Sequence, residues 1–147
     1  MKTIFLSAFL AITLLATASG TKDKTAASYK TSRSLFAEFG RVDNVKWSNA
    51  MNDMIKADFI LDDEAICAFF DANGDFVAST KAVDFNELPK NLKTAINDKV
   101  PGANILTVFE FNSKTERAWF VETELNNEKK VWKGNGFGSL TRYYVKD

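Results

Sequence analysis

Apolar and polar positions alternate along much of this chain, and two stretches of helical spacing interrupt the alternation. Leu35, Phe36 and Phe39 recur at helical spacing, which predicts a short amphipathic helix over residues 28–39. The segment ELPKNLKTAINDKVPG, residues 87–102, predicts a second helix that ends at its Pro-Gly pair. The apolar stripe of this second helix consists of Leu88, Leu92, Ala95, Ile96 and Val100.

Period-two alternation predicts β-strands between and after these helices. Turn signals separate the strands at Asp62-Asp63, Asn73-Gly74, Asn126-Asn127 and Asn135-Gly136. The Asn73-Gly74 pair is a favoured hairpin signal, because both central residues of a type I′ turn have positive φ. The predicted strands cover residues 45–47, 55–61, 64–71, 75–83, 104–111, 116–125, 129–133 and 139–145.

The order of these elements is helix, antiparallel strands, helix, antiparallel strands. We interpret this order as a degenerate internal repeat, about 31–83 and 86–147, within a single domain over residues 31–147. Helices and strands that are segregated in this way are typical of α+β proteins. The sequence therefore predicts an α+β fold of two tandem helix-plus-antiparallel-sheet units, with the helices packed on one face of the sheet.

The N-terminal segment indicates export. Lys2 precedes an apolar run over residues 4–15, and Ala16-Thr17-Ala18 matches the small-residue cleavage pattern. The run is shorter than the ~20 residues that a membrane span needs. We predict a signal peptide over residues 1–18, a flexible lead-in over residues 19–30, and a periplasmic or secreted mature protein without a stable membrane anchor.

The composition disfavours several functional classes. The 147 residues carry 19 basic and 19 acidic side chains, which gives no electrostatic reason to expect nucleic acid or an anionic membrane as a partner. Histidine is absent, so the commonest general base and metal ligand is missing. Cys67 is the only cysteine, which excludes an intrachain disulfide. We predict a protein that is not an enzyme and that has no catalytic residues, cofactor or metal.

Two glycine-containing loops resemble chemical motifs without matching them. If Asp71 is position one of a calcium loop, Gly74 falls at position four instead of six, and Ala82 stands where a bidentate glutamate is required. The segment GNGFG, residues 134–138, precedes a predicted strand, whereas a dinucleotide fingerprint opens a helix. We interpret both loops as turns between strands.

Aromatic side chains are the candidates for contact with a partner. The chain has 13 phenylalanines, which indicates a Phe-rich core, an apolar binding surface, or both. Alternation places Ile105, Phe109 and Phe111 on one face of their strand. We expect the face away from the helices to carry an aromatic patch rimmed by charge, unless the sheet curls or dimerises and buries that face. The candidate partner-binding residues are Phe70, Trp119, Phe120, Trp132 and Tyr143.

Three segments resemble a known group of small exported bacterial proteins. NVKW (44–47), FFDANGDF (69–76) and the predicted second helix (87–102) resemble the PepSY-like, β-lactamase-inhibitor-like family, over about residues 33–147. The resemblance implies tandem helix-plus-sheet units, an extracytoplasmic location, and a non-catalytic binding or inhibitory role. It carries over no ligand or catalytic residue, because the family pattern is structural.

These observations leave three functions open. The first is an exported binding module that contacts a protein or peptide, with inhibition as one form of that contact. The second is a carrier of a small apolar ligand in the Phe-rich interior. The third is a carboxylate-based enzyme of the cell envelope, which the absence of histidine disfavours. The sequence does not identify the partner, and it leaves a dimer open.

Overall fold

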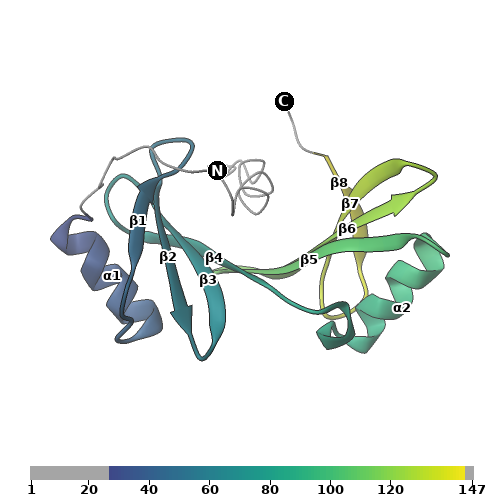
Figure 1. Ribbon diagram of the computed structural model, residues 1–147, viewed down its shortest axis with the longest axis horizontal. Coiled ribbons are helices and arrows are strands. Elements are labelled where there is room, and N and C mark those ends of the chain that lie inside the picture. Colours follow the sequence, from purple (N-terminus) through teal and green to yellow (C-terminus); the bar gives the residue numbers. More distant parts are fainter. Residues whose placement is uncertain (1–26, 145–147) are drawn as a thin grey trace.

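Within residues 27–144, the chain folds into one long antiparallel sheet with two short α-helices (Figure 1). The computed structural model describes residues 27–144; the predicted signal peptide and most of the predicted lead-in lie outside this range. The helical elements are α1 (Tyr29–Phe39), the 3₁₀ helix η3 (Phe85–Glu87) and α2 (Lys90–Lys99). The strands are β1 (Lys46–Asn49), β2 (Ile55–Leu61), β3 (Glu64–Phe70), β4 (Phe76–Ala82), β5 (Asn104–Ser113), β6 (Arg117–Leu125), β7 (Glu128–Gly134) and β8 (Leu140–Tyr143).

The prediction of two tandem helix-plus-sheet units is wrong. Strand β4 pairs with β5 in antiparallel register from Ala78↔Ser113 to Ala82↔Phe109. The eight strands therefore form a single sheet in sequence order, and the described part of the chain is a sheet-dominated fold with two α-helices. Without this pairing, β4 and β5 would each expose an edge of unpaired backbone N–H and C=O groups, and the pairing satisfies those groups.

The strand register places both helices on the same face of the sheet. Ala68, Ser79 and Asn112 are paired across β3, β4 and β5, and alternation along β5 continues this face to Val108. Ala68 belongs to the apolar cluster that packs on Leu35 of α1, which we call the α1 cluster. Val108 belongs to the apolar cluster that packs on Leu92 and Ile96 of α2, which we call the α2 cluster. We refer to this face as the helix-bearing face and to the other as the helix-free face.

Capping interactions at both ends set the boundaries of helix α1. Ser28 is the N-cap, and its hydroxyl accepts a hydrogen bond from the Thr31 N–H at 3.1 Å. Gly40 follows the last turn with φ of 71°, and its N–H donates to the Phe36 carbonyl at 2.9 Å. The helix predicted over residues 28–39 is therefore confirmed to within one residue, because a cap and a stop bracket the apolar positions.

The turns divide into two kinds. Asp62 and Asp63 have φ of 52° and 64°, and Asn126 and Asn127 have φ of 53° and 63°, as two-residue type I′ hairpins require. At the Asn-Gly pair the type I′ prediction is wrong, because positive φ occurs there at Gly74 alone. The chain instead forms a five-residue loop over residues 71–75, which the side chain of its first residue closes.

A β-bulge shifts the alternation near the start of β5. Ile105 pairs with Thr123, but the next paired residue of β5 is Thr107, so Leu106 is left without a partner in the register. Beyond the bulge the side-chain directions are reversed relative to a regular strand. Ile105 therefore packs in the α2 cluster, and the prediction that it shares a face with Phe109 and Phe111 is wrong.

Candidate functional site

The helix-free face carries a contiguous cluster of aromatic and small apolar side chains, which we call the aromatic cluster. An antiparallel sheet with helices on one face usually presents polar side chains on the other. Here the buried members are Met54, Phe69, Ala78, Phe109, Phe111, Ala118 and Phe120. The partly buried side chains packed against them are Ala50, Cys67, Val77, Val131 and Tyr143.

Phe120 makes three ring contacts within this cluster. Its ring stacks on Phe109 with centroids 5.5 Å apart and an interplanar angle of 16°. It meets Phe111 at 6.1 Å and Tyr143 at 5.1 Å, both at 83°. These are the offset and edge-to-face arrangements that aromatic pairs prefer. Burial raises the pKa of Tyr143 above its ordinary value.

The buried members of the aromatic cluster form its floor, and this floor is shielded from solvent in the full-length chain. Its seven buried members are between 0% and 8% exposed, with Phe120 at 3%. The prediction of an open aromatic patch is therefore wrong for the full-length chain. Partly exposed side chains remain at the margin of the cluster, among them Tyr143 and Val131.

Charged pairs border the aromatic cluster. Lys133 is paired in register with Phe120 and forms an ion pair with Glu116 at 2.6 Å. On the other side, Lys56 is paired with Phe69 and forms an ion pair with Asp58 at 2.9 Å. The helix-free face thus has an apolar floor and a rim on which both signs of charge are present.

Cys67 lies in this face, between the floor and the rim. Burial, followed by the neighbouring Asp58 carboxylate, raises the pKa of its thiol well above the ordinary value. A thiol that stays protonated is a weak nucleophile and a poor metal ligand. The geometry therefore suits a small packed side chain at this position.

The structure brings together only two of the five candidate partner-binding residues. Phe120 and Tyr143 meet on the helix-free face. Phe70 is fully buried in the α1 cluster, and Trp119 is 8% exposed in the α2 cluster. Trp132 is 5% exposed and is paired in register with Val121, which belongs to the α2 cluster. The binding role of all five stays a prediction.

The Asp71–Asp75 loop uses its acidic groups for structure. One carboxylate oxygen of Asp71 accepts hydrogen bonds from the N–H groups of Asn73 and Asp75, both at 2.9 Å. Asp75 forms an ion pair with Lys30 of α1 at 2.9 Å. Within residues 27–144, no group of three or more His, Cys, Asp or Glu side chains is arranged to hold a metal ion.

The loop between β7 and β8 repeats this design. The Asn135 side-chain oxygen accepts from the N–H groups of Phe137 and Ser139 at 3.0 and 3.1 Å. The Gly138 N–H donates to the Asn135 carbonyl, as the Gly74 N–H donates to the Asp71 carbonyl. An amide oxygen thus performs the same role as the carboxylate, so this role does not require a negative charge.

Sequence reasoning missed a buried carboxylate on the helix-bearing face. Glu110 is 5% exposed and accepts hydrogen bonds from Arg117 Nε at 2.7 Å and Asn112 Nδ2 at 2.8 Å. Burial acts to raise the pKa of Glu110, but the hydrogen bonds from Arg117 and Asn112, together with the positive charges of Arg117 and Lys81, hold the pKa below its ordinary value. In the sequence this residue is one polar position in a strand, and no local signal distinguishes it.

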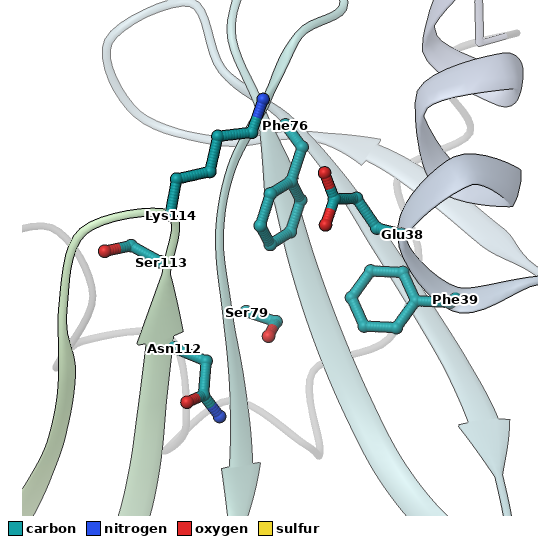
Figure 2. A pocket seen from close by; sticks show the side chains of 7 residues that line it. All are labelled: Glu38, Phe39, Phe76, Ser79, Asn112, Ser113 and Lys114. Atoms are coloured by element: carbon teal, nitrogen blue, oxygen red, sulfur yellow. The ribbon is translucent and has the colours of Figure 1, made fainter.

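A cleft of about 260 Å³ lies beside this carboxylate, between the end of α1 and strands β4 and β5 (Figure 2). Sequence reasoning missed the cleft too, because its walls come from three elements that are far apart in the chain. The lining residues are Glu38, Phe39, Phe76, Ser79, Asn112, Ser113 and Lys114.

Comparisons with solved structures show which proteins share this fold. A BLIP-like protein from Bacteroides fragilis superposes with a TM-score of 0.73 and 18% identity, covering 80% of this chain and 86% of the other. A DUF2874 family protein from Bacteroides uniformis gives 0.72 and 19%, covering 80% and 88%. A Bacteroides eggerthii protein, described provisionally as periplasmic, gives 0.69 and 13%, covering 80% and 89%.

At these identities the likeness concerns the fold alone. No protein-family model matches the chain, and no curated protein matches it. No helix within residues 27–144 is long and apolar enough to cross a membrane. The chain therefore shares the fold of BLIP-like and DUF2874 family proteins, and the PepSY part of the resemblance is not shown.

Proposed function

We propose that this protein is an exported, non-catalytic binding module that contacts a protein or peptide through the helix-free face of its sheet. The observation that supports the proposal is the aromatic cluster on a sheet face that no described helix covers. Aromatic side chains bordered by charged residues are typical of protein interaction sites. The BLIP-like and provisionally periplasmic neighbours are consistent with this function.

The margin of the cluster supplies the groups that a partner would contact. Tyr143 combines an apolar ring with a hydroxyl and is only partly buried. Lys133 and Glu116 form an ion pair on the rim and offer both signs of charge. Contact with the charged rim would orient the partner, and the partly exposed side chains at the margin, Tyr143 and Val131, would supply apolar contact area.

Site-specific photo-crosslinking tests the proposal. The mature chain, residues 19–147, would carry benzoylphenylalanine in place of Tyr143 on the helix-free face. A matched variant would carry it in place of Phe36, which is 64% exposed on α1. Both chains would be irradiated in an envelope extract of the native host, with excess unlabelled mature chain as competitor.

We expect a discrete crosslinked band from position 143 that the competitor removes, and no such band from position 36. Mass spectrometry of the band then distinguishes a foreign partner from a second copy of this chain. Equal crosslinking at both positions, or none at 143, contradicts the proposal.

A further inference from the structure

The cleft on the helix-bearing face has the features of a small-ligand site that is separate from the helix-free face. Its lining comes from the last turn of α1, from β4, and from the end of β5 with the turn that follows (Figure 2). Binding pockets for drug-sized ligands are about 300–1,000 Å³. A volume of about 260 Å³ therefore suits a smaller molecule.

The apolar wall of the cleft is held in place by ring packing. Phe39 and Phe76 meet edge to face with centroids 5.7 Å apart and an interplanar angle of 76°. Phe39 also contacts Phe59 at 5.1 Å, and Phe76 contacts Phe70 at 5.9 Å. Since both rings are supported from behind, their exposed surfaces form a rigid apolar wall, and little side-chain entropy would be lost on binding.

The floor of the cleft is polar. Asn112 donates its side-chain N–H to Glu110 at 2.8 Å, which leaves the amide oxygen as an acceptor. Within residues 27–144, neither this oxygen nor the Ser79 hydroxyl has a hydrogen-bond partner in another side chain. No side-chain N or O atom of the described residues is both fully buried and unpaired, so these two atoms reach the solvent in the cleft. They can satisfy a polar group of a ligand.

Two opposite charges also line the cleft. Glu38 and Lys114 form no ion pair within residues 27–144, whereas the nearby Lys81 and Arg117 are paired with Glu64 and Glu110. In the view of Figure 2, the side chains of Glu38 and Lys114 lie on either side of the Phe76 ring. An ammonium group could pair with Glu38 and a carboxylate with Lys114, while an apolar group contacts the two rings.

From this arrangement we propose that the cleft binds a small zwitterion with an apolar side chain, of the size of a free aliphatic or aromatic amino acid. The ammonium group of the ligand pairs with Glu38, the carboxylate pairs with Lys114, and the side chain packs on Phe39 and Phe76. The site lies on the opposite face from the proposed partner surface. The two proposals are therefore independent, and the failure of one does not contradict the other.

Titration of the ¹⁵N-labelled mature chain with L-phenylalanine and L-leucine, followed by NMR, tests this site. We expect saturable amide shifts at residues 38–40, 79 and 112–114, and none at Phe120 or Tyr143. Phenylpropionate lacks the ammonium group and phenethylamine lacks the carboxylate, so each should bind at least about ten-fold more weakly than L-phenylalanine.

The matched variants are Lys114→Gln, Glu38→Gln and, as control, Lys90→Gln on α2; all three side chains are exposed, so folding is not at risk. The first two should each weaken binding at least about ten-fold, and the control should leave it unchanged. The proposal is overturned by the absence of saturable shifts, by equal affinity in all three variants, or by shifts confined to other residues. Tighter binding of a dipeptide than of the free amino acid also overturns it, because the site would then serve peptide ends.

Discussion

The rings of Phe120 and Tyr143 meet edge to face at 5.1 Å, although strand β7 separates their strands. Neighbouring strands lie about 4.8 Å apart, so backbones two strands apart are separated by roughly 10 Å. Both side chains therefore lean towards each other over β7. This packing links the edge strand β8 to the centre of the aromatic cluster.

Phe120→Ala should destabilise the full-length protein by ~3 kcal/mol or more. The side chain is 3% exposed and touches three rings, so its loss leaves a cavity in the cluster. Urea unfolding followed by tryptophan fluorescence measures the change. Phe36→Ala is the matched control, because Phe36 is 64% exposed and its loss should change stability by no more than about 0.5 kcal/mol. Equal stabilities of the two variants would show that the aromatic cluster is not part of the core.

Gly74→Ala should destabilise the protein more than Gly102→Ala. Both glycines have positive φ, 82° and 77°, so each substitution strains the backbone by roughly 1–2 kcal/mol. A Cβ on Gly74 would also lie 2.7 Å from the Thr31 hydroxyl and 3.0 Å from the Thr31 nitrogen, whereas a Cβ on Gly102 meets nothing within 4 Å. We expect the Gly74 variant to lose at least ~1 kcal/mol more in chemical denaturation. If both variants lose the same amount, the loop does not press on α1 as described.

Asp71→Ala should destabilise the loop by about 1–3 kcal/mol, because two backbone N–H groups lose their acceptor. Asp71→Asn should cost much less, since Asn135 performs the same role with an amide oxygen. Thermal unfolding measures both variants. Millimolar calcium should leave the melting temperature of the wild type unchanged, because a bound ion would raise it by mass action. A rise with calcium that disappears in Asp71→Asn would show that the loop binds the ion.

Glu110 should make the protein acid-sensitive. Its pKa is lower in the folded than in the unfolded chain, so protonation favours unfolding. The stabilisation is complete above the ordinary carboxyl value of 4.5 and is lost as the pH falls below it towards the folded-state pKa. Glu110→Gln should therefore be less stable than wild type at pH 7, and its stability should fall less on acidification.

Urea unfolding of wild type and Glu110→Gln, carried out in steps from neutral pH to below pH 4.5, measures this difference. The exposed Asp98, changed to asparagine, serves as the control and should keep the wild-type pH profile. A Glu110→Gln profile parallel to that of wild type would show that the ion pair with Arg117 contributes nothing to acid sensitivity.

Local patterns determined most of the elements. Ser28, the apolar spacing and Gly40 specify α1, because a helix needs only nearby residues to form its hydrogen bonds and caps. The Asp62-Asp63 and Asn126-Asn127 turns were also predictable, since Asp and Asn tolerate positive φ. Period-two alternation puts the adjacent residues Trp119 and Phe120 on opposite faces of β6, and the structure has them in different clusters.

The candidate sites could be predicted only in part. The sequence indicated that the helix-free face would be aromatic, but the burial of Phe120 depends on rings from β5 and β8. The cleft between Phe39 and Asn112 could not be predicted from the sequence, because no sequence spacing links the end of α1 to the end of β5. Sites of this kind are built by long-range packing.

By itself, the sequence determined the helices, the strands and the direction of most side chains, because these follow from hydrogen bonds and periodicities within a few residues. Tertiary structure decided three further features. Pairing of Ala78 with Ser113 merged two expected units into one sheet, the bulge at Leu106 returned Ile105 to the α2 cluster, and the Asp71 side chain closed a five-residue loop at Gly74. Each depends on backbone groups finding partners that the linear pattern does not specify, and the need to satisfy those groups selected the final arrangement.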